Sequence, residues 1–309
     1  MPYTGELAGL ATALLWAFTS IFFAQAGRLV GSFTVNNIRL LVAVVVYAVV
    51  VLLTTGSLWP RDLNQQQLFW LGLSGVVGLV IGDGCGFKAL VMIGPRLATL
   101  IYAGAPVMAT IMAWPFLGEH LSLMNLLGIA VTLGGITWVV LERRYDSDNR
   151  FGLDQDHPDR GTLFKGVLLG IVAALGQAAG LVLAKQGMVG AGGDLAPLEA
   201  AYVRMVVSLV VIWILAAGRG QMIQTIRAMK NGRALSFCVA GAIVGPFLGV
   251  WMSLVSVKYI PAGLAATLNS TTPVLVLPLV ARWYKEKVTF RAAVGAVVTV
   301  AGVAMIFLL

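Results

Sequence analysis

One acidic side chain stands deep inside a long apolar segment of the chain. Asp83 follows a run of glycine and aliphatic residues, within a stretch long enough to cross a lipid bilayer. Ionisable groups at that depth are costly and mark the paths of solutes, ions or protons. We therefore expect Asp83 to bind a cationic group or to carry a proton. The structural alternative is an ion pair with Lys88 or with another basic group.

Hydroxyl, amide and aromatic side chains occur in the other apolar segments. The run from Asn269 to Thr272 is the most polar stretch inside any of them. Such groups find no hydrogen-bond partner in hydrocarbon, so we expect them to line a path for a polar solute. Packing between helices is the alternative. With Asp83, the expected substrate-binding residues are Trp16, Ser20, Tyr102, Gln177, Trp251, Asn269 and Thr272.

The first apolar segment carries a polar and aromatic stripe. At about 100° per residue of a helix, Trp16 and Ser20 share one face with Thr12, Thr19 and Phe23. A stripe that faces inward predicts a lining role. Ordinary helix packing, with the hydroxyl groups bonded to their own backbone, explains the stripe equally well.

Two prolines interrupt apolar segments near their middle. Pro106 and Pro273 each remove a backbone hydrogen bond from a helix and free a carbonyl group. Freed backbone groups at membrane depth are tolerated where protein or a water-filled cavity covers them. We expect both prolines to act as hinges beside the solute path.

The composition of the whole chain indicates what must position these residues. Of 309 residues, 59% are hydrophobic and 11% are charged, and the mean hydropathy is +0.91, whereas soluble domains carry about 25% charged residues. Apolar runs of about twenty residues follow one another, each long enough to span a bilayer as a helix. The sequence thus predicts an all-α integral membrane protein with ten transmembrane helices, at approximately 6–25, 34–54, 67–92, 96–117, 121–141, 163–185, 198–217, 234–256, 262–282 and 288–308.

Charge and cysteine usage exclude other classes. The net charge of +8 could signal a nucleic-acid partner, but the basic residues are confined to short segments between helices, where membrane topology explains them. Cys85 and Cys238 lie inside predicted helices and are expected to be buried thiols. The chain contains no H-E-x-x-H motif for zinc and no G-x-x-x-x-G-K-[ST] motif for nucleotide phosphates. We expect no metal, no cofactor and no nucleic acid.

The second half of the chain repeats the pattern of the first. When the chain is slid along itself so that Pro106 meets Pro273, Glu119 meets Glu286 without a gap, and we call this displacement the repeat offset. The repeat offset also superposes two ridges of small residues at every fourth position, which we expect to form close helix contacts in lipid. These ridges comprise Ser74, Gly78, Gly82 and Gly86 in the first half and Gly241, Gly245, Gly249 and Ser253 in the second.

An odd number of helices in each repeat requires that the second repeat enter the membrane upside down. Inverted repeats are the arrangement that alternating access uses. We predict a first repeat at 1–141, a polar linker at 142–162 and a second, inverted repeat at 163–309. With the N-terminus outside, fifteen Lys and Arg residues lie on the cytoplasmic side and three on the other side, as the positive-inside rule requires.

These residues resemble the motifs of the drug/metabolite transporter superfamily, in particular those of its two-domain EamA-type members. In that family each repeat has a helix with a central Pro and a terminal Glu, then a Ser or Thr three residues later and spaced glycines in the last helix. The resemblance spans nearly the whole chain, although Lys285 and Lys287 around Glu286 depart from the first-half pattern. The matching residues here are Pro106, Glu119, Ser122, Gly128 and Gly135, then Pro273, Glu286, Thr289, Gly295 and Gly302.

The resemblance implies a carrier with two inverted five-helix repeats, of a kind in which many members export amino acids or other metabolites. Members are often placed with cytoplasmic termini, which is opposite to the orientation that the charge count favours.

Other charged or small residues are expected to have structural roles. Arg39 and Arg204 come early in equivalent helices, where we expect them to extend to the membrane surface or to anchor the structure. Glu119 and Glu286 mark helix ends, where we expect capping or bridging between helices rather than substrate contact. The remaining structural or hinge positions are Pro106, Pro273, Gly78, Gly82, Gly245 and Gly249.

The sequence favours a secondary transporter, an exporter of small organic metabolites such as amino acids, in the cell (inner) membrane. The expected partners are a small-molecule substrate, the lipid bilayer and a proton or counter-substrate, and the expected state is a monomer or a weak homodimer. A carrier or flippase of lipids or lipid-linked substrates is the alternative.

An intramembrane hydrolase is a further alternative. Ser74 belongs to a G-x-S-G run, but the histidines are His120 in a hairpin and His157 in the linker, so no base is placed to activate the serine. We therefore do not expect an enzyme.

Overall fold

The computed structural model describes residues 3–142, 160–272, 274–275 and 290–308, and every regular element within them is a helix. Most of the predicted linker (143–159), together with Pro273 and Glu286, lies outside the described residues.

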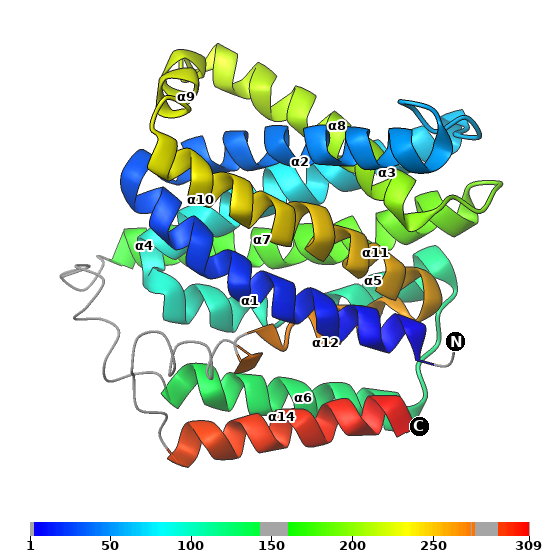
Figure 1. Cartoon of the computed structure of the whole chain (residues 1–309). Helices are drawn as coiled ribbons and strands as arrows, with labels where there is room; N and C mark the ends of the chain where they lie inside the picture. Colours follow the sequence, from blue (N-terminus) through cyan, green and yellow to red (C-terminus); the bar gives the residue numbers. More distant parts are fainter. Residues whose placement is uncertain (1–2, 143–159, 273, 276–289, 309) are drawn as a thin grey trace.

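Apolar helices make up both halves of the described chain (Figure 1). The first half consists of α1 (Thr4–Val30), α2 (Ser32–Thr55), α3 (Gln65–Gly75), η1 (Val76–Gly82), α4 (Asp83–Tyr102), α5 (Ala105–Leu117) and α6 (Leu123–Glu142). The second consists of α7 (Arg160–Lys185), η2 (Gln186–Gly190), α8 (Pro197–Gly218), α9 (Met222–Ala228), α10 (Gly232–Ala242), η3 (Ile243–Gly249), α11 (Val250–Tyr259), α12 (Ala262–Asn269) and α14 (Phe290–Leu308). Within the described residues, six helical stretches are long and apolar enough to cross a membrane, and three further apolar helices are shorter. The predicted all-helical membrane fold is confirmed.

Equivalent helices of the two halves run in opposite directions. In Figure 1, α1 and α7 cross the molecule in opposite senses, and so do α6 and α14. The halves also share a detail that the sequence pattern did not predict, a π-helical segment at the same place in each repeat. The segment η1 ends at Gly82 and η3 ends at Gly249, and the repeat offset superposes these two glycines. The two halves are therefore inverted copies of one five-helix unit.

Each small-residue ridge packs against the first helix of the other repeat. The α3–η1–α4 stretch lies on α7, and the α10–η3–α11 stretch lies on α1. A methyl group at Gly176 of α7 would come within 2.8 Å of Gly82 Cα, and one at Gly180 within 3.0 Å of Gly78 Cα. Only glycine allows backbones to approach this closely. The ridges thus hold the two repeats together.

The last helices of the two repeats form a separate pair at one side of the bundle (Figure 1). In the contact between α6 and α14, Gly135 faces Thr299, and Gly302 faces Thr132. The hydroxyl groups of both threonines bond to the carbonyl four residues earlier in their own helix, so neither hydroxyl is left exposed to lipid at this contact.

The boundary between the predicted third and fourth spans lies about ten residues later than expected. A boundary between 92 and 96 was predicted, but α4 continues to Tyr102, and the helical hydrogen bonds are interrupted at Ala103 and Gly104 instead. Pro106 then occupies the first turn of α5, where its missing N–H group costs nothing. In the second repeat α12 ends at Asn269, the counterpart of Tyr102 at the repeat offset, so both repeats break at the same point.

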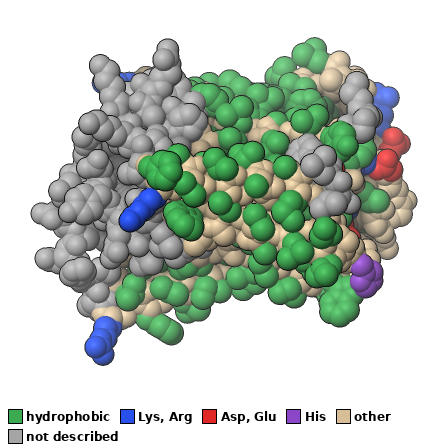
Figure 2. All heavy atoms as spheres, turned by 90° about the horizontal axis from the view of Figure 1, so that it is seen from below, with side chains coloured by type: hydrophobic (Ala, Val, Ile, Leu, Met, Phe, Trp, Pro, Cys, Tyr) green, Lys and Arg blue, Asp and Glu red, His purple; other side chains and the backbone are tan. Residues whose placement is uncertain are grey.

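The core is shared by the two repeats, while lipid-facing side chains cover the outside. Tyr47 and Leu71 of the first half are fully buried in one cluster with Met188 and Leu254 of the second. The face shown in Figure 2 is hydrophobic across its middle, and charged side chains of the described residues lie toward its two ends. This distribution fits a bilayer around the middle of the molecule and polar head groups at both ends.

Candidate functional site

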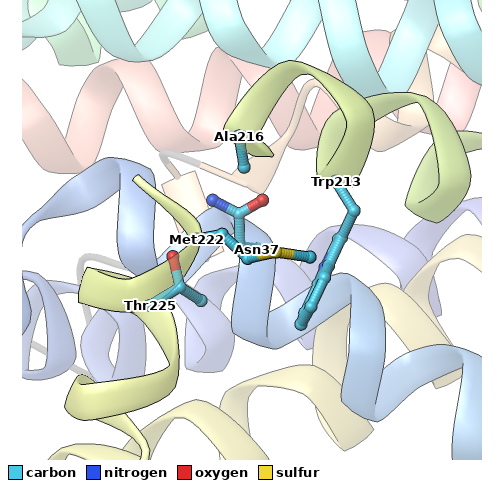
Figure 3. Close-up of a pocket in the computed structure, with 5 residues that line it drawn as sticks. All are labelled: Asn37, Trp213, Ala216, Met222 and Thr225. Atoms are coloured by element: carbon cyan, nitrogen blue, oxygen red, sulfur yellow. The ribbon is translucent and has the colours of Figure 1, made fainter. Parts of the chain in front are cut away.

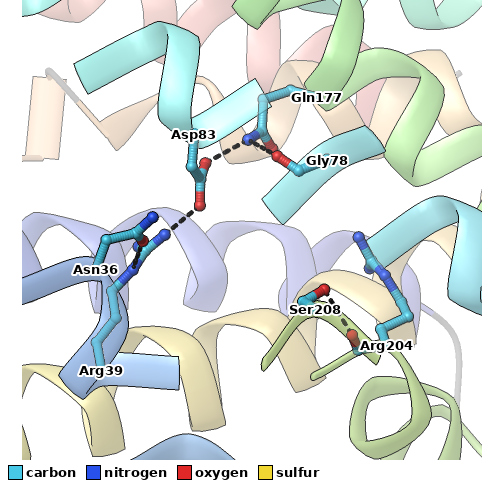
Figure 4. Close-up of polar contacts among 7 residues, drawn as sticks. All are labelled: Asn36, Arg39, Gly78, Asp83, Gln177, Arg204 and Ser208. Carbon is cyan, nitrogen blue, oxygen red and sulfur yellow. Dashed lines mark hydrogen bonds and ion pairs between the residues drawn. The ribbon is translucent and has the colours of Figure 1, made fainter. Parts of the chain in front are cut away.

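A buried ion pair joins two helices of the first repeat. Asp83 is the first residue of α4, and its Oδ2 pairs with Nη2 of Arg39 on α2 (Figure 4). The side chains are 14% and 3% exposed, respectively. The partner of Asp83 is therefore Arg39 and not Lys88, which is exposed.

Amide side chains extend this ion pair on both sides. Gln177 Nε2 donates to Asp83 Oδ1 at 2.6 Å and to the carbonyl oxygen of Gly78 at 3.2 Å. At the other end, Arg39 Nε donates to Asn36 Oδ1 at 2.6 Å. The resulting chain of polar groups, which we call the Asp83 cluster, runs from Asn36 through Arg39, Asp83 and Gln177 to Gly78 (Figure 4). Gln177 belongs to α7, so the cluster connects the two repeats.

Aromatic rings cover the guanidinium of Arg39. The ring centroids of Phe23 and Phe87 lie 5.7 and 5.4 Å from its Cζ atom. Cation–π contacts of this kind stabilise a cation where water is scarce. Of the two roles expected for Arg39, extension to the membrane surface is wrong, because the ion pair and the two rings hold it inside the protein as an anchor.

The π-helical segment η1 places Asp83 at this position. Its glycines face α7, as Gly78 and Gly82 both contact that helix. A π-helical turn adds a residue to the helix and shifts the faces of the residues that follow it, and such turns are frequent at functional sites. Asp83 follows η1 directly and turns toward α2. The sequence could predict the glycine ridge but not this local change of pitch.

Three of the predicted substrate-binding residues meet at the Asp83 cluster. Besides Asp83 and Gln177, Tyr102 lies at the end of α4 with its hydroxyl group beside Gln177. A methyl group at Gly86 would come within 3.1 Å of that hydroxyl. The helix break at Ala103 follows immediately, so the phenol stands where the backbone leaves the helical path.

Two other predicted residues lie at the end of α12 and shortly after it. Asn269 Nδ2 donates to Ser253 Oγ at 3.0 Å, while its buried Oδ1 has no hydrogen-bond partner among the described residues. Thr272 Oγ1 donates to the carbonyl oxygen of Ala13 in α1 at 3.2 Å. These contacts join α12 to α11 and to the first repeat.

Two predicted tryptophans also border η3. Trp16 of α1 packs its indole against Gly249, and the ring of Trp251 lies 6.0 Å from the ring of Phe247. The stripe on α1 thus takes part in helix packing, which was the alternative interpretation. Ser20 is exposed and donates to the carbonyl oxygen of Ala17 in its own helix, so it joins neither group.

A second buried arginine lies in the equivalent helix of the second repeat. Arg204 of α8 is 4% exposed, so the expectation that it extends to the membrane surface is also wrong. Its Nε atom is buried without a hydrogen-bond partner, and Arg204 takes part in no ion pair within the described part of the chain. Figure 4 shows its guanidinium pointing toward η1. A Cβ atom added to Gly78 of η1 would lie 3.5 Å from Arg204 Nη2. The sequence showed the correspondence of Arg39 and Arg204 but not that both side chains are buried.

An ion pair at one end of the bundle joins the two repeats. Lys185 at the end of α7 pairs with Glu119, which follows α5, at 2.6 Å, and it also donates to the carbonyl oxygen of Ile260 at 2.7 Å. The other carboxylate oxygen of Glu119 accepts from the backbone N–H of Ala262 at 2.8 Å, at the start of α12. Glu119 thus caps one helix and bridges to another.

A small pocket lies between α2, α8 and α9, apart from all of the predicted site residues (Figure 3). It is a shallow depression lined by Asn37, Trp213, Ala216, Met222 and Thr225.

The two inverted repeats enclose charged and polar groups inside their apolar spans. This architecture is typical of membrane transporters. A family model described as the EamA-like transporter family matches residues 3–141 and 164–308, and the chain belongs to that family. One solved structure, titled only "Crystal structure of protein", superposes with a TM-score of 0.69 over 99% of this chain and 98% of that one, at 16% sequence identity. That likeness shows the shared fold. No curated protein sequence matches the chain.

Proposed function

We propose that the protein is a secondary transporter that exports small organic metabolites, amino acids among them, across the cell (inner) membrane. The observation that carries the proposal is the Asp83 cluster, in which Asp83 pairs with Arg39 inside the first repeat and accepts a hydrogen bond from Gln177 of the second. Charged groups inside a membrane are retained where they serve a solute or proton path.

Alternating access supplies the mechanism. The repeats contact each other along the glycine ridges, and the Asp83 cluster lies beside one of these contacts. A rocking motion of one repeat against the other would expose the cluster first to one side of the membrane and then to the other. The chain has no nucleotide-binding loop motif, so an ion gradient or exchange of solutes drives uphill transport.

The ion pair between Glu119 and Lys185 fits this mechanism as a gate. Glu119 belongs to the first repeat and Lys185 to the second, and the side chains are 14% and 15% exposed. Opening on that side requires this pair to separate. Both side chains are largely buried, so the pair holds that end closed until the repeats move apart and water reaches the two charges.

A ligand screen tests the proposal. The purified protein is heated in the presence of amino acids, nucleobases, organic cations or lipid head groups at two pH values, because a ligand that binds the native state raises the unfolding midpoint by mass action. Hits are repeated in Asp83→Asn and Asn269→Ala, with Asp194→Asn in the outer pair with Lys258 as the control. We expect a metabolite hit that is lost in Asp83→Asn and kept in Asp194→Asn. A hit that survives both site variants contradicts the proposed site, and stabilisation by lipid head groups alone favours a lipid carrier.

A further inference from the structure

Arg204 is a buried cation without a partner in the described part of the chain. A guanidinium group stays protonated in proteins and carries five N–H donors. Charges inside a protein normally pair, because an uncompensated buried charge is strongly destabilising. The Nε atom of Arg204 nevertheless meets no acceptor, and Ser208, one turn later, donates to the Arg204 carbonyl group and not to its side chain.

The repeat explains why Arg204 lacks the partners that Arg39 has. Arg39 is held by Asn36, three residues earlier, and by Asp83. In this part of the repeat the register drifts slightly from the repeat offset, and aligning Arg39 with Arg204 brings Asn36 onto Ala201. The second arginine therefore has no amide one turn before it.

Asp83 also has an apolar counterpart. At the repeat offset, Asp83 falls on Val250, the first residue of α11, which is buried. At the two positions equivalent to the groups that hold the first arginine, the second repeat therefore carries aliphatic side chains. Among these residues, two arginines and one aspartate leave one positive charge uncompensated in the described part of the bundle.

Arg204 borders the Asp83 cluster on the side of Gly78. Its Nη2 lies beside Gly78, and the carbonyl oxygen of Gly78 accepts from Gln177. The absence of a side chain at Gly78 leaves room for the guanidinium. A solute held by the Asp83 cluster would thus have a fixed cation next to it.

We propose that Arg204 binds an oxyanion of the transported solute, either a carboxylate or a phosphate. This oxyanion would pair with Arg204 as the carboxylate of Asp83 pairs with Arg39. This inference rests on the proposed transport function and names the charge of its substrate. The planar fork of a guanidinium matches two oxygens of a carboxylate or phosphate, and such charge-assisted pairs are among the stronger hydrogen bonds.

Supplying the missing carboxylate within the chain tests the proposal. Val250→Asp places an acid at the position equivalent to Asp83, and Val250→Asn is the matched control with the same shape and no charge. The probes are amino acids, mono- and dicarboxylates, inorganic phosphate, sugar phosphates and phosphatidylglycerol nanodiscs, each paired with a neutral analogue. The readout is the unfolding midpoint as a function of probe concentration.

We expect at least one anionic probe, and not its neutral analogue, to raise the midpoint of the wild type and of Val250→Asn. In Val250→Asp its affinity should fall about 10- to 100-fold, the usual range for one charged hydrogen bond. Arg204→Gln should lose the shift and Arg204→Lys keep part of it. Carboxylate, free phosphate and lipid head group are distinguished by which probe acts.

Equal affinities in Val250→Asp and Val250→Asn would overturn the proposal, as would a wild type that no anion stabilises. Because Arg204→Gln alone can fail to fold, the Val250 pair decides. A counterflow assay in proteoliposomes distinguishes a failure of the oxyanion site from a failure of the proposed transport function. An anion that binds through Arg204 without counterflow rejects the transport function, whereas counterflow of a neutral or cationic solute that Val250→Asp leaves unchanged rejects the oxyanion site.

Discussion

Replacing Asp83 by asparagine removes the only carboxylate that contacts Arg39 in the described chain. Both side chains are largely buried, at 14% and 3% exposure, so solvent cannot take over from the lost partner. Breaking a buried pair by removing one member costs about 3 to 5 kcal/mol. The new amide oxygen can still accept one bond from Arg39, and Asn36 keeps its own. We therefore expect Asp83→Asn near the lower end, at about 3 kcal/mol, and Asp83→Leu near the upper end.

A double-mutant cycle measures this coupling. Asp83→Asn, Arg39→Gln and the double variant are unfolded by denaturant in detergent micelles, and their free energies of unfolding are compared with that of the wild type. Removing both charges leaves no uncompensated ion, so the double variant should lose at least about 2 kcal/mol less than the sum of the single losses. Asp194→Asn is the matched control, because Asp194 is 73% exposed and its pair with Lys258 should contribute under about 1 kcal/mol.

Additive single losses would refute the coupling, and so would an Asp83→Asn variant as stable as Asp194→Asn. Either result would mean that Asp83 and Arg39 do not form a pair in the membrane protein, and the Asp83 cluster would lose its central contact.

Three other variants test the packing, the polar contacts of η3 and the gate. Gly176→Ala puts a methyl group 2.8 Å from a backbone atom of η1 and should lower the free energy of unfolding by about 1 to 3 kcal/mol in denaturant. Gly134→Ala is the control and should leave it unchanged, because a methyl group there meets nothing within 4 Å. Equal effects of the two variants would contradict the close contact of the repeats. Tyr47→Phe removes a 2.7 Å hydrogen bond from a fully buried hydroxyl to a carbonyl oxygen of η3 and should cost about 1 to 2 kcal/mol in the same assay; an unchanged variant would show that the bond is not formed. Glu119→Gln breaks the largely buried ion pair of the gate. It should cost about 3 kcal/mol in the same assay and raise the labelling rate of a cysteine introduced on the inner side of the pair. An unchanged labelling rate would count against the gate.

The fold was largely predictable from the sequence because lipid imposes simple rules. Long apolar runs must be helices, and the match of Pro106 with Pro273 and of the glycine ridges fixes the repeat. The same repeat offset reappears in the structure as the spacing of η1 and η3. The π-helical pitch itself was not predictable, because η1 contains only apolar residues and glycine, so a shift of its faces leaves no polar residue out of place.

The candidate site was predictable residue by residue but not contact by contact. Helical periodicity shows which face a residue occupies, and it placed Asp83, Tyr102 and Gln177 among polar candidates from different spans. It cannot show which helix lies opposite, and the partner of Asp83 is 44 residues away on α2. Depth in the membrane was also misjudged for Arg39, because its position early in a helix is compatible with both a surface and a buried site until the packing is known.

Counterflow in proteoliposomes tests the central claim most directly. Vesicles loaded with an unlabelled amino acid or other hit from the ligand screen are diluted into a trace of the same labelled solute. The structure predicts transient, saturable accumulation of label by the wild type and by Asp194→Asn, and its loss in Asp83→Asn. Flux that does not saturate, or counterflow that Asp83→Asn leaves intact, would contradict a carrier whose substrate path runs through the Asp83 cluster.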